Sequence, residues 1–200
     1  MLWDFGGVIL DSPFDGFARY EQEQGLPSGF LRTLNATNPD TNAWARLERG
    51  EVGPVEFAAL FEGEAEAAGG TIDAAAVLAM LSGRLRPEMV EAVRRCAARL
   101  PTGLVTNNFT LGGSRPDLEE VLGLFHVVVE SCKVGVRKPD PRIYLLACDA
   151  LGVSPAGSVF LDDLGVNLKP ARALGMTTIK VAEPAAALRE LEAAVGFPLS

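Results

Sequence analysis

The sequence predicts an α/β protein whose parallel sheet carries helices on both faces and whose first strand is followed by a long helical insertion. Two patterns indicate this fold class. Short apolar runs alternate with amphipathic segments in the second half of the chain, and only helical patterns occur between residue 14 and about residue 82. Apolar strands separated by helices are typical of a sheet buried on both faces. We therefore expect a three-layer, Rossmann-like parallel-sheet core with an inserted α-helical domain.

The expected core elements are five short apolar strands and the helices between them. The strands lie at residues 1–5, 102–106, 126–130, 158–161 and 177–181. The helices lie at residues 117–122, 141–151, 168–174 and 184–195. Gly175 directly follows the third of these helices, where it can adopt the left-handed conformation that ends a helix.

The insertion begins with a helical pattern at Phe14. Further helical patterns lie at residues 41–49, 54–68 and 73–81. Glycines between these segments mark the loops. We expect residues 1–12 and 83–200 to form the core domain and residues 13–82 to form the helical domain.

Composition argues against several classes of function. The chain has 200 residues and a net charge of −8 without a basic patch, so nucleic acid is not an expected partner. No apolar run approaches the ~20 residues that span a bilayer, and the first residues lack a signal-peptide pattern. We therefore expect a cytoplasmic protein with no membrane partner. The only histidine, His126, argues against histidine triads and zinc sites, and the three cysteines have no metal or disulfide spacing.

Polar residues follow the expected strands at their carboxyl ends, where parallel sheets bind ligands. The set consists of Asp4, Thr106, Asn107, Lys138, Asp162, Asp163 and Asn167. Taken alone, Asp4 could be a turn residue, and the paired acids could cap a helix. Their joint occurrence favours one common site. Only three residues precede Asp4, so either the natural chain begins upstream of Met1 or the first strand is short.

The residue types in this set indicate phosphate chemistry with a magnesium ion. Three carboxylates in one place repel each other and cannot all stay ionised without a cation. Hard oxygen ligands select Mg²⁺, which keeps several waters and binds substrate phosphate. A lysine and a hydroxyl would then hold phosphoryl oxygens, and one carboxylate is left to attack phosphorus.

Four segments resemble the motifs of the haloacid dehalogenase-like (HAD) hydrolase superfamily, in the order of that family. They are WDFGGVIL, LVTNN, the pair Lys138-Pro139, and VFLDDLGVN. The stretches ESCKVGVRKPDPRIY and VFLDDLGVNLKPARALGM are especially similar to the phosphatase lobe of soluble epoxide hydrolases and to the HAD domain of an acyl-CoA dehydrogenase family. The similarity covers nearly the whole chain, and four motifs together are far more specific than any one alone.

The resemblance implies a Mg²⁺-dependent phosphatase that acts on a small phosphorylated metabolite through an aspartyl-phosphate. Asp4 would be the nucleophile and a metal ligand, and the main-chain carbonyl of Gly6 would be a second ligand. Asp162 and Asp163 would hold Mg²⁺ directly or through water, and Asn167 would support them.

The resemblance also implies a phosphate-binding set and a cap. Thr106 and Asn107 would bind the transferring phosphoryl group, and Lys138 would neutralise both Asp4 and the phosphate. The helical insertion would be the cap, which closes over the site and selects the substrate.

Four further residues have simpler interpretations. We expect Arg137 to face solvent and His126 to begin a strand without a chemical role. Trp44 and Phe14 either line the substrate face of the cap or pack in its core, and the pattern leaves this choice open.

The chain departs from the family at Gly6, where the family has a second aspartate that protonates the leaving group and later activates water. Loss of a general acid–base typically costs ~10²–10⁴-fold in rate. The metal ligand at this position is a main-chain carbonyl, so the metal site need not suffer. Our hypothesis is that the protein prefers substrates whose leaving group needs little protonation, such as sugar 1-phosphates, aryl phosphates or acyl phosphates.

Two alternative functions remain open at this point. A 2-haloacid dehalogenase would use the same aspartate to attack carbon without a metal, although the pair Asp162 and Asp163 argues against it. A catalytically impaired HAD domain would bind phosphate and metal but would have lost turnover with Gly6.

Overall fold

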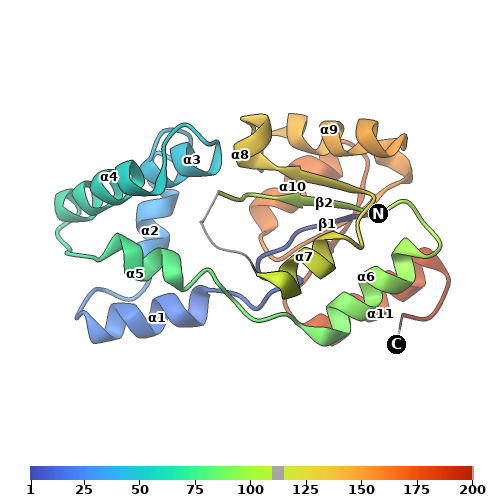
Figure 1. The fold of residues 1–200 in the computed structure, drawn as a ribbon, viewed down its shortest axis with the longest axis horizontal. Coiled ribbons are helices and arrows are strands. Elements are labelled where there is room, and N and C mark those ends of the chain that lie inside the picture. The colour runs from blue at the N-terminus through green and yellow to red at the C-terminus, as the bar shows by residue number, and fades with distance from the viewer. Residues whose placement is uncertain (110–114, 200) are drawn as a thin grey trace.

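A five-stranded parallel sheet with helices on both faces forms the core of the computed structural model, which describes residues 1–109 and 115–199 (Figure 1). The strands are β1 (Leu2–Trp3), β2 (Gly103–Thr106), β3 (Val127–Glu130), β4 (Val159–Asp162) and β5 (Thr177–Lys180). Their order is β3-β2-β1-β4-β5, so β1 is central and pairs with β2 on one side and β4 on the other. The predicted fold class is confirmed.

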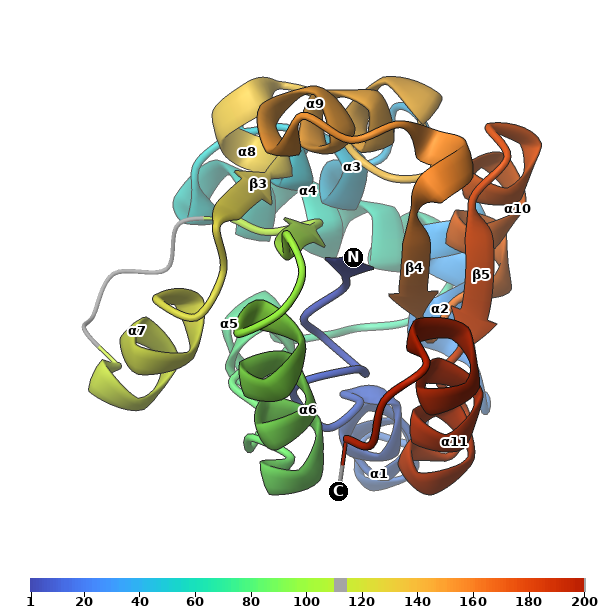
Figure 2. The same ribbon diagram turned by 90° about the vertical axis from the view of Figure 1, so that its right-hand side faces the viewer.

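Successive residues of a strand point to opposite faces of the sheet, so apolar strands put apolar side chains on both faces. Helices cover both faces and bury these side chains. The core helices are α6 (Pro87–Ala97), α7 (Pro116–Leu122), α8 (Ser131–Val134), α9 (Pro141–Leu151), α10 (Gly165–Ala173) and α11 (Pro184–Val195), with a 3₁₀ turn η1 (Pro155–Gly157). Trp3 packs in one apolar cluster with residues of α6 and α11, whereas its neighbour Leu2 packs in another with residues of α9 and α10. Figure 2 shows α9 on one side of the sheet and α6 and α11 on the other.

The observed element bounds differ from the expected ones near the candidate site. The first strand is short, because only Leu2–Trp3 belong to the ladder, although the Asp4 amide still donates to Leu161 O at 2.9 Å. Strand β4 includes Asp162 as its last residue, and α10 begins at Gly165 rather than at residue 168. Asn167 therefore lies within the first turn of α10 instead of before the helix.

Three helices, α2 (Phe30–Ala36), α6 and α8, were not expected from the pattern. The sequence does carry a signal for α6, since Pro87 opens the helix and its buried residues Met89, Ala92, Val93 and Cys96 have helical spacing. Helix α2 is only seven residues long and begins after Gly29 in the left-handed conformation, so its periodicity is weak.

A second group of helices lies to one side of the sheet and is called the helical lobe below (Figure 1). It comprises α1 (Phe14–Glu23), α2, α3 (Ala43–Glu48), α4 (Pro54–Ala67) and α5 (Ala74–Ala79). These helices share an apolar cluster of their own. Trp44 packs edge-on against Phe57 and Phe61, with ring centroids 5.4 and 5.5 Å away, so its ring belongs to this core. The Phe14 ring lies under the Arg32 guanidinium at 4.4 Å.

The chain enters and leaves the helical lobe through two segments that lie side by side. Leu10 and Leu85 form an antiparallel bridge, and the Asp11 amide donates to Arg84 O at 2.9 Å. The two connections between the core and the helical lobe are therefore hydrogen-bonded to each other. The domain bounds at residues 12/13 and 82/83 stay predictions.

Among residues 1–109 and 115–199, no helix combines the length and the apolar character required to cross a membrane.

We expect Phe57→Ala to destabilise the helical lobe by about 3–5 kcal/mol, because it removes a fully buried ring from the aromatic cluster. Val55→Ala on the same helix is the matched control: Val55 is 88% exposed, so its change should stay within about 0.5 kcal/mol. Denaturant unfolding of the two variants measures both effects, and equal losses would contradict the assigned core.

Candidate active site

Asp4 lies where the chain leaves the central strand, and its side chain is fixed by the turn that follows. Its Oδ1 accepts a hydrogen bond from the Phe5 amide at 2.7 Å. Three successive amides, from residues 8, 9 and 10, then donate to Phe5 O and close the turn. The carboxylate is mostly buried, with 7% of the residue exposed.

Gly7 is required by this turn for two reasons. Its φ of +72° is in the left-handed region, and a Cβ there would lie 2.3 Å from Asp163 Oδ2. The absence of a side chain thus lets the Asp163 carboxylate approach the turn. Gly6 is different, since a Cβ at that position would meet no atom within 4 Å.

The carboxylates of Asp4, Asp162 and Asp163 form a compact cluster. Each offers an oxygen, and these three atoms lie within 4.8 Å of one another. Asp162 is fully buried at the end of β4, and Asp163 follows it in the loop toward α10. Oxygen donors in this number and spacing suit a divalent cation such as Mg²⁺, which takes a few carboxylates and completes its shell with water and phosphate.

Lys138 reaches this cluster from the loop before α9. Its Nζ lies 2.6 Å from Asp4 Oδ1 and 2.8 Å from Asp162 Oδ2, and its side chain has no exposed surface. One ammonium therefore bridges the carboxylates of two neighbouring strands.

Asp162 is held by further contacts that fix its orientation. Asn167 Nδ2 lies 3.0 Å from each carboxylate oxygen, and the Leu164 amide donates to Oδ1 at 2.8 Å. The Tyr144 hydroxyl donates to Asn167 O at 2.7 Å, which anchors the first turn of α10. Tyr144 was missed by the sequence reasoning; its signal is a polar tip on the buried face of the helix at residues 141–151.

The cluster brings three carboxylates together beside one ammonium, and this excess of negative charge affects the pKa values of Asp4 and Asp163. Burial raises the pKa of Asp4 well above its ordinary value, against the attraction of Lys138. Burial, and then the charge of Asp162, raise the pKa of Asp163 to about 6. Burial alone would lower the pKa of Lys138, but the attraction of Asp162 and Asp4 outweighs it and raises that pKa, so the lysine stays charged.

Thr106 and Asn107 lie at the end of β2, as expected. Thr106 is buried and pairs in register with Glu130 of β3. The Asn107 side chain makes protein contacts that the sequence did not suggest: its Oδ1 accepts from the Lys138 amide at 2.8 Å, and its Nδ2 donates to Lys138 O at 3.0 Å. The same Nδ2 donates to Glu48 Oε2, in the helical lobe, at 3.0 Å. A phosphoryl contact from either residue stays a prediction.

The expectation that Arg137 faces solvent is wrong. Its Nε lies 2.7 Å from Glu48 Oε2 as an ion pair, with the N–H bond not aimed at the oxygen, and its Nη1 donates to Pro39 O at 2.7 Å. Both partners belong to the helical lobe, and the Arg137 side chain is only 21% exposed. Loop position alone could not reveal a partner about 90 residues away in the sequence.

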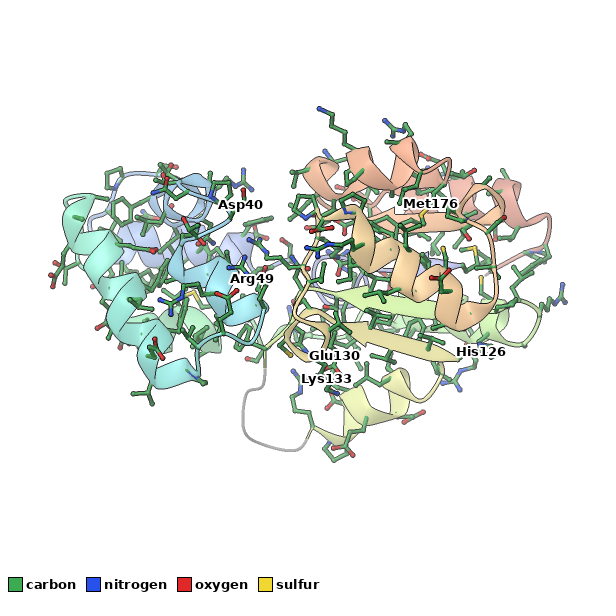
Figure 3. The ribbon with its side chains drawn as sticks, turned by 90° about the horizontal axis from the view of Figure 1, so that it is seen from above. Asp40, Arg49, His126, Glu130, Lys133 and Met176 are labelled. Atoms are coloured by element: carbon green, nitrogen blue, oxygen red, sulfur yellow. The ribbon has the colours of Figure 1, made fainter. Side chains whose placement is uncertain are left out.

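His126 lies just before β3, at the end of the sheet away from the helical lobe (Figure 3). Its Nδ1 accepts from the Thr102 amide at 3.2 Å and lies 2.8 Å from the Thr102 hydroxyl. Glu130 and Lys133, by contrast, lie near the lobe in the same view. His126 therefore lies at the opposite end of the parallel sheet from the strand ends that carry Asp4 and Asp162.

A cavity of about 450 Å³ lies within the helical lobe, lined by residues of α2, α4 and the loops beside them. No residue of the carboxylate cluster lines it. Its location does not identify it with the candidate active site.

Comparison with known proteins supports the resemblance drawn from the motifs. A family model described as haloacid dehalogenase-like hydrolase matches residues 1–175. Acyl-CoA dehydrogenase family member 10 of Mus musculus is 37% identical over 205 residues, which cover 100% of this chain and 19% of that protein. Bifunctional epoxide hydrolase 2 of Sus scrofa is 34% identical over 215 residues, covering 99% of this chain and 39% of that protein. The chain thus spans less than half the length of these relatives.

Among solved structures, a wild-type HAD-family enzyme of Bacteroides thetaiotaomicron, in complex with magnesium and inorganic phosphate, has a TM-score of 0.58 to this chain. The two are 19% identical, and the match covers 90% of this chain and 91% of the other. At this identity the likeness is evidence of the shared fold.

We expect Mg²⁺ to raise the melting temperature of the protein more at pH 7.5 than at pH 5. The pKa of Asp163 is raised from 3.8 to about 6, so without metal its ionisation weakens the folded state as pH rises through this window. The ionised form is also the one that binds the cation, so metal stabilisation grows over the same window. Thermal unfolding with and without Mg²⁺ at several pH values measures the difference.

Asp163→Asn should lose most of this Mg²⁺-dependent shift, whereas Asp149→Asn, on the exposed side of α9, should keep it. A shift of the same size at both pH values, or one unaffected by Asp163→Asn, would contradict a cation site at this cluster.

Proposed function

Because the chain belongs to the haloacid dehalogenase-like hydrolase family, we propose that it is a phosphomonoesterase that needs a divalent cation and acts on a small phosphorylated metabolite. The observation that carries this proposal is the buried Lys138 ammonium between Asp4 and Asp162, beside the third carboxylate of Asp163. This arrangement combines a carboxylate nucleophile, a fixed positive charge and ligands for Mg²⁺.

In the proposed reaction, a carboxylate oxygen of Asp4 attacks phosphorus and the bond to the leaving oxygen breaks. The product is an aspartyl-phosphate, and water then attacks its phosphorus to release inorganic phosphate and restore the carboxylate. The Phe5 amide and Lys138 both contact Asp4 Oδ1, so they fix the rotation of the carboxylate. A bound Mg²⁺ would supply charge neutralisation at the phosphoryl oxygens.

Four groups would hold the cation, and two residues would hold the phosphoryl group. The ligands are the side chains of Asp4, Asp162 and Asp163 together with the main-chain carbonyl of Gly6. Thr106 and Asn107 would bind phosphoryl oxygens from the end of β2. These roles rest on the family resemblance and on the positions of the residues at one edge of the sheet.

Gly6 supports the proposal of a narrow choice of leaving group. It is exposed and has no side chain to act as an acid, and a Cβ there would meet no atom within 4 Å. A leaving group that departs as a weakly basic oxygen needs little protonation. Sugar 1-phosphates, aryl phosphates and acyl phosphates meet this condition.

The dehalogenase alternative has less support from the geometry. Attack on carbon needs no metal, yet Asp163 adds a third carboxylate to a cluster already containing Asp4 and Asp162. Such a cluster is electrostatically unfavourable unless a cation is bound. Chloride release from haloacids in the presence of a chelator would favour the dehalogenase instead.

We expect Asp4→Asn to lower the rate of phosphate release by about 10³-fold or more, because the amide cannot form the aspartyl-phosphate. A screen of phosphorylated metabolites with Mg²⁺ identifies the best substrate, on which parent and variant are compared. Asp149→Asn, an exposed acid on α9, serves as the control and should keep the parent rate. Undiminished turnover by Asp4→Asn would refute the proposed nucleophile.

We expect the parent to hydrolyse an aryl phosphate at least about 10²-fold faster than a simple alkyl phosphate, because no side chain at position 6 protonates the leaving oxygen. Gly6→Asp should accelerate the alkyl substrate most and narrow this ratio, since the space at Gly6 admits a side chain. Equal parent rates on both substrates would contradict the leaving-group hypothesis. An inert parent that gains activity with Gly6→Asp would identify an impaired phosphate-binding domain.

A further inference from the structure

Glu48 ends helix α3 at the boundary between the helical lobe and the core. Helices α3 and α8 lie side by side there (Figure 1), and Arg49, the next residue, lies on the side of the lobe that faces the core (Figure 3). The approach is close, since a Cβ at Gly50 would lie 2.6 Å from Cys132 O and the φ of Gly50 is +71°. A carboxylate at this helix end is therefore enclosed by both lobes.

The Glu48 carboxylate is buried, and both of its oxygens have partners. Oε1 accepts from Trp44 Nε1 at 2.9 Å, within the helical lobe. Oε2 accepts from Asn107 Nδ2 at 3.0 Å and pairs with Arg137 Nε at 2.7 Å, and both of these residues belong to the core. Burial raises the pKa of Glu48, while Arg137 and Trp44 oppose the rise. The buried Glu48 carboxylate therefore contacts the helical lobe through Trp44 and the core through Asn107 and Arg137.

Asn107 connects Glu48 to the backbone of Lys138. Its Oδ1 accepts from the Lys138 amide at 2.8 Å, and its Nδ2 donates to Lys138 O at 3.0 Å. One side chain therefore binds both main-chain groups of Lys138. The preceding residue, Arg137, is held by the helical lobe through Glu48 and Pro39 O. The backbone from which the Lys138 side chain extends is thus fixed from the lobe side.

We propose that Glu48 is a positioning residue, which acts through Asn107 and Arg137 to hold the Lys138 backbone so that its ammonium lies between Asp4 and Asp162. The inference rests on the proposed function only for its kinetic effect, because the positioning itself is a property of the fold. Small displacements of a group that neutralises charge at the reacting centre cost rate rather than ground-state binding.

The contacts distinguish positioning from direct acid catalysis by Glu48. A general acid must present its proton to the leaving oxygen. Both Glu48 oxygens instead accept from, or pair with, protein donors, of which two lie in the core loops beside Lys138. We therefore expect the effect of Glu48 to pass through Lys138, not through a proton of its own.

The kinetic test compares Glu48→Ala, Glu48→Gln and Glu51→Ala on the substrate found in the screen. Glu48→Ala should lower kcat by about 10- to 100-fold with KM within about 3-fold, because Lys138 is misplaced while the substrate site remains. Glu48→Gln keeps an acceptor for Asn107 but places its amide N–H group toward Trp44 Nε1, so its kcat should lie between those of the parent and Glu48→Ala. Glu51→Ala removes an exposed partner of Arg49 and should match the parent.

A second measurement reports on Lys138 without any turnover. The chain has only four lysines, at positions 133, 138, 169 and 180, so protein labelled with ¹⁵N-lysine gives four assignable amide signals. A Lys138→Arg variant identifies the Lys138 signal. In Glu48→Ala the Lys138 amide should exchange its hydrogen at least about 10-fold faster than in the parent, because Asn107 loses its hydrogen bond to Glu48. The other three amides and the spectrum of Glu51→Ala should not change.

The two measurements separate the failure of each claim. If exchange at Lys138 is unchanged in Glu48→Ala, the positioning role is overturned, regardless of which substrate the protein hydrolyses. A loss confined to KM also overturns it, since that result indicates a role in substrate binding. A third outcome is faster exchange at Lys138 in Glu48→Ala together with a parent protein that has no phosphatase activity. That combination supports the positioning role and rejects the proposed function instead.

Discussion

The ammonium of Lys138 between Asp4 and Asp162 is the interaction on which the rest of the site depends. A side chain with no exposed surface can keep a charge only if opposite charges surround it. The parallel register supplies them, because Trp3 lies opposite Leu161, and the next residue on each strand is an aspartate. Neighbouring strands are ≈ 4.7–4.9 Å apart, so two residues separated by over 150 positions in sequence necessarily become neighbours. Short strands ending in acids are therefore sufficient to place this pair.

The third carboxylate gives the site its chemical character. Asp4 and Asp162, when both are ionised, already carry more negative charge than the single Lys138 ammonium balances. Asp163 adds a further acid, and its approach depends on the missing side chain of Gly7. Burial, and then repulsion from Asp162, raise the pKa values of Asp4 and Asp163, so their ionised forms are less favourable in the metal-free protein than in water. A divalent cation relieves this cost, so the same feature that weakens the metal-free cluster strengthens its selection for a cation.

The sequence was informative where function follows from strand order, and less so where it depends on contacts between distant segments. Asp4 and Asp162 could be brought together from the rule that parallel strands collect their carboxyl ends at one edge. Lys138 was placed with them from its loop beyond an expected strand, and the resemblance of its motif to a known one then assigned its role. Glu48 and Arg137 could not be foreseen, because each looks in sequence like an ordinary surface charge. Helix–strand alternation likewise gave the fold class, but local pattern does not set the residue at which α10 begins.

The missing acid at Gly6 makes the contact between the helical lobe and the Lys138 loop more important for the proposed chemistry. An enzyme with a general acid can gain part of its rate from proton transfer. Without that group, the fixed charges at phosphorus must supply a larger share, and their placement matters more. Lys138 supplies such a charge between Asp4 and Asp162, and its backbone is held through a carboxylate of the lobe that the family resemblance assigns to substrate selection. A lobe that holds Lys138 in place only when docked would link substrate enclosure to charge alignment, so that a poorly enclosed substrate would meet a poorly aligned ammonium. Discrimination between substrates would then appear in the rate of the chemical step as well as in binding.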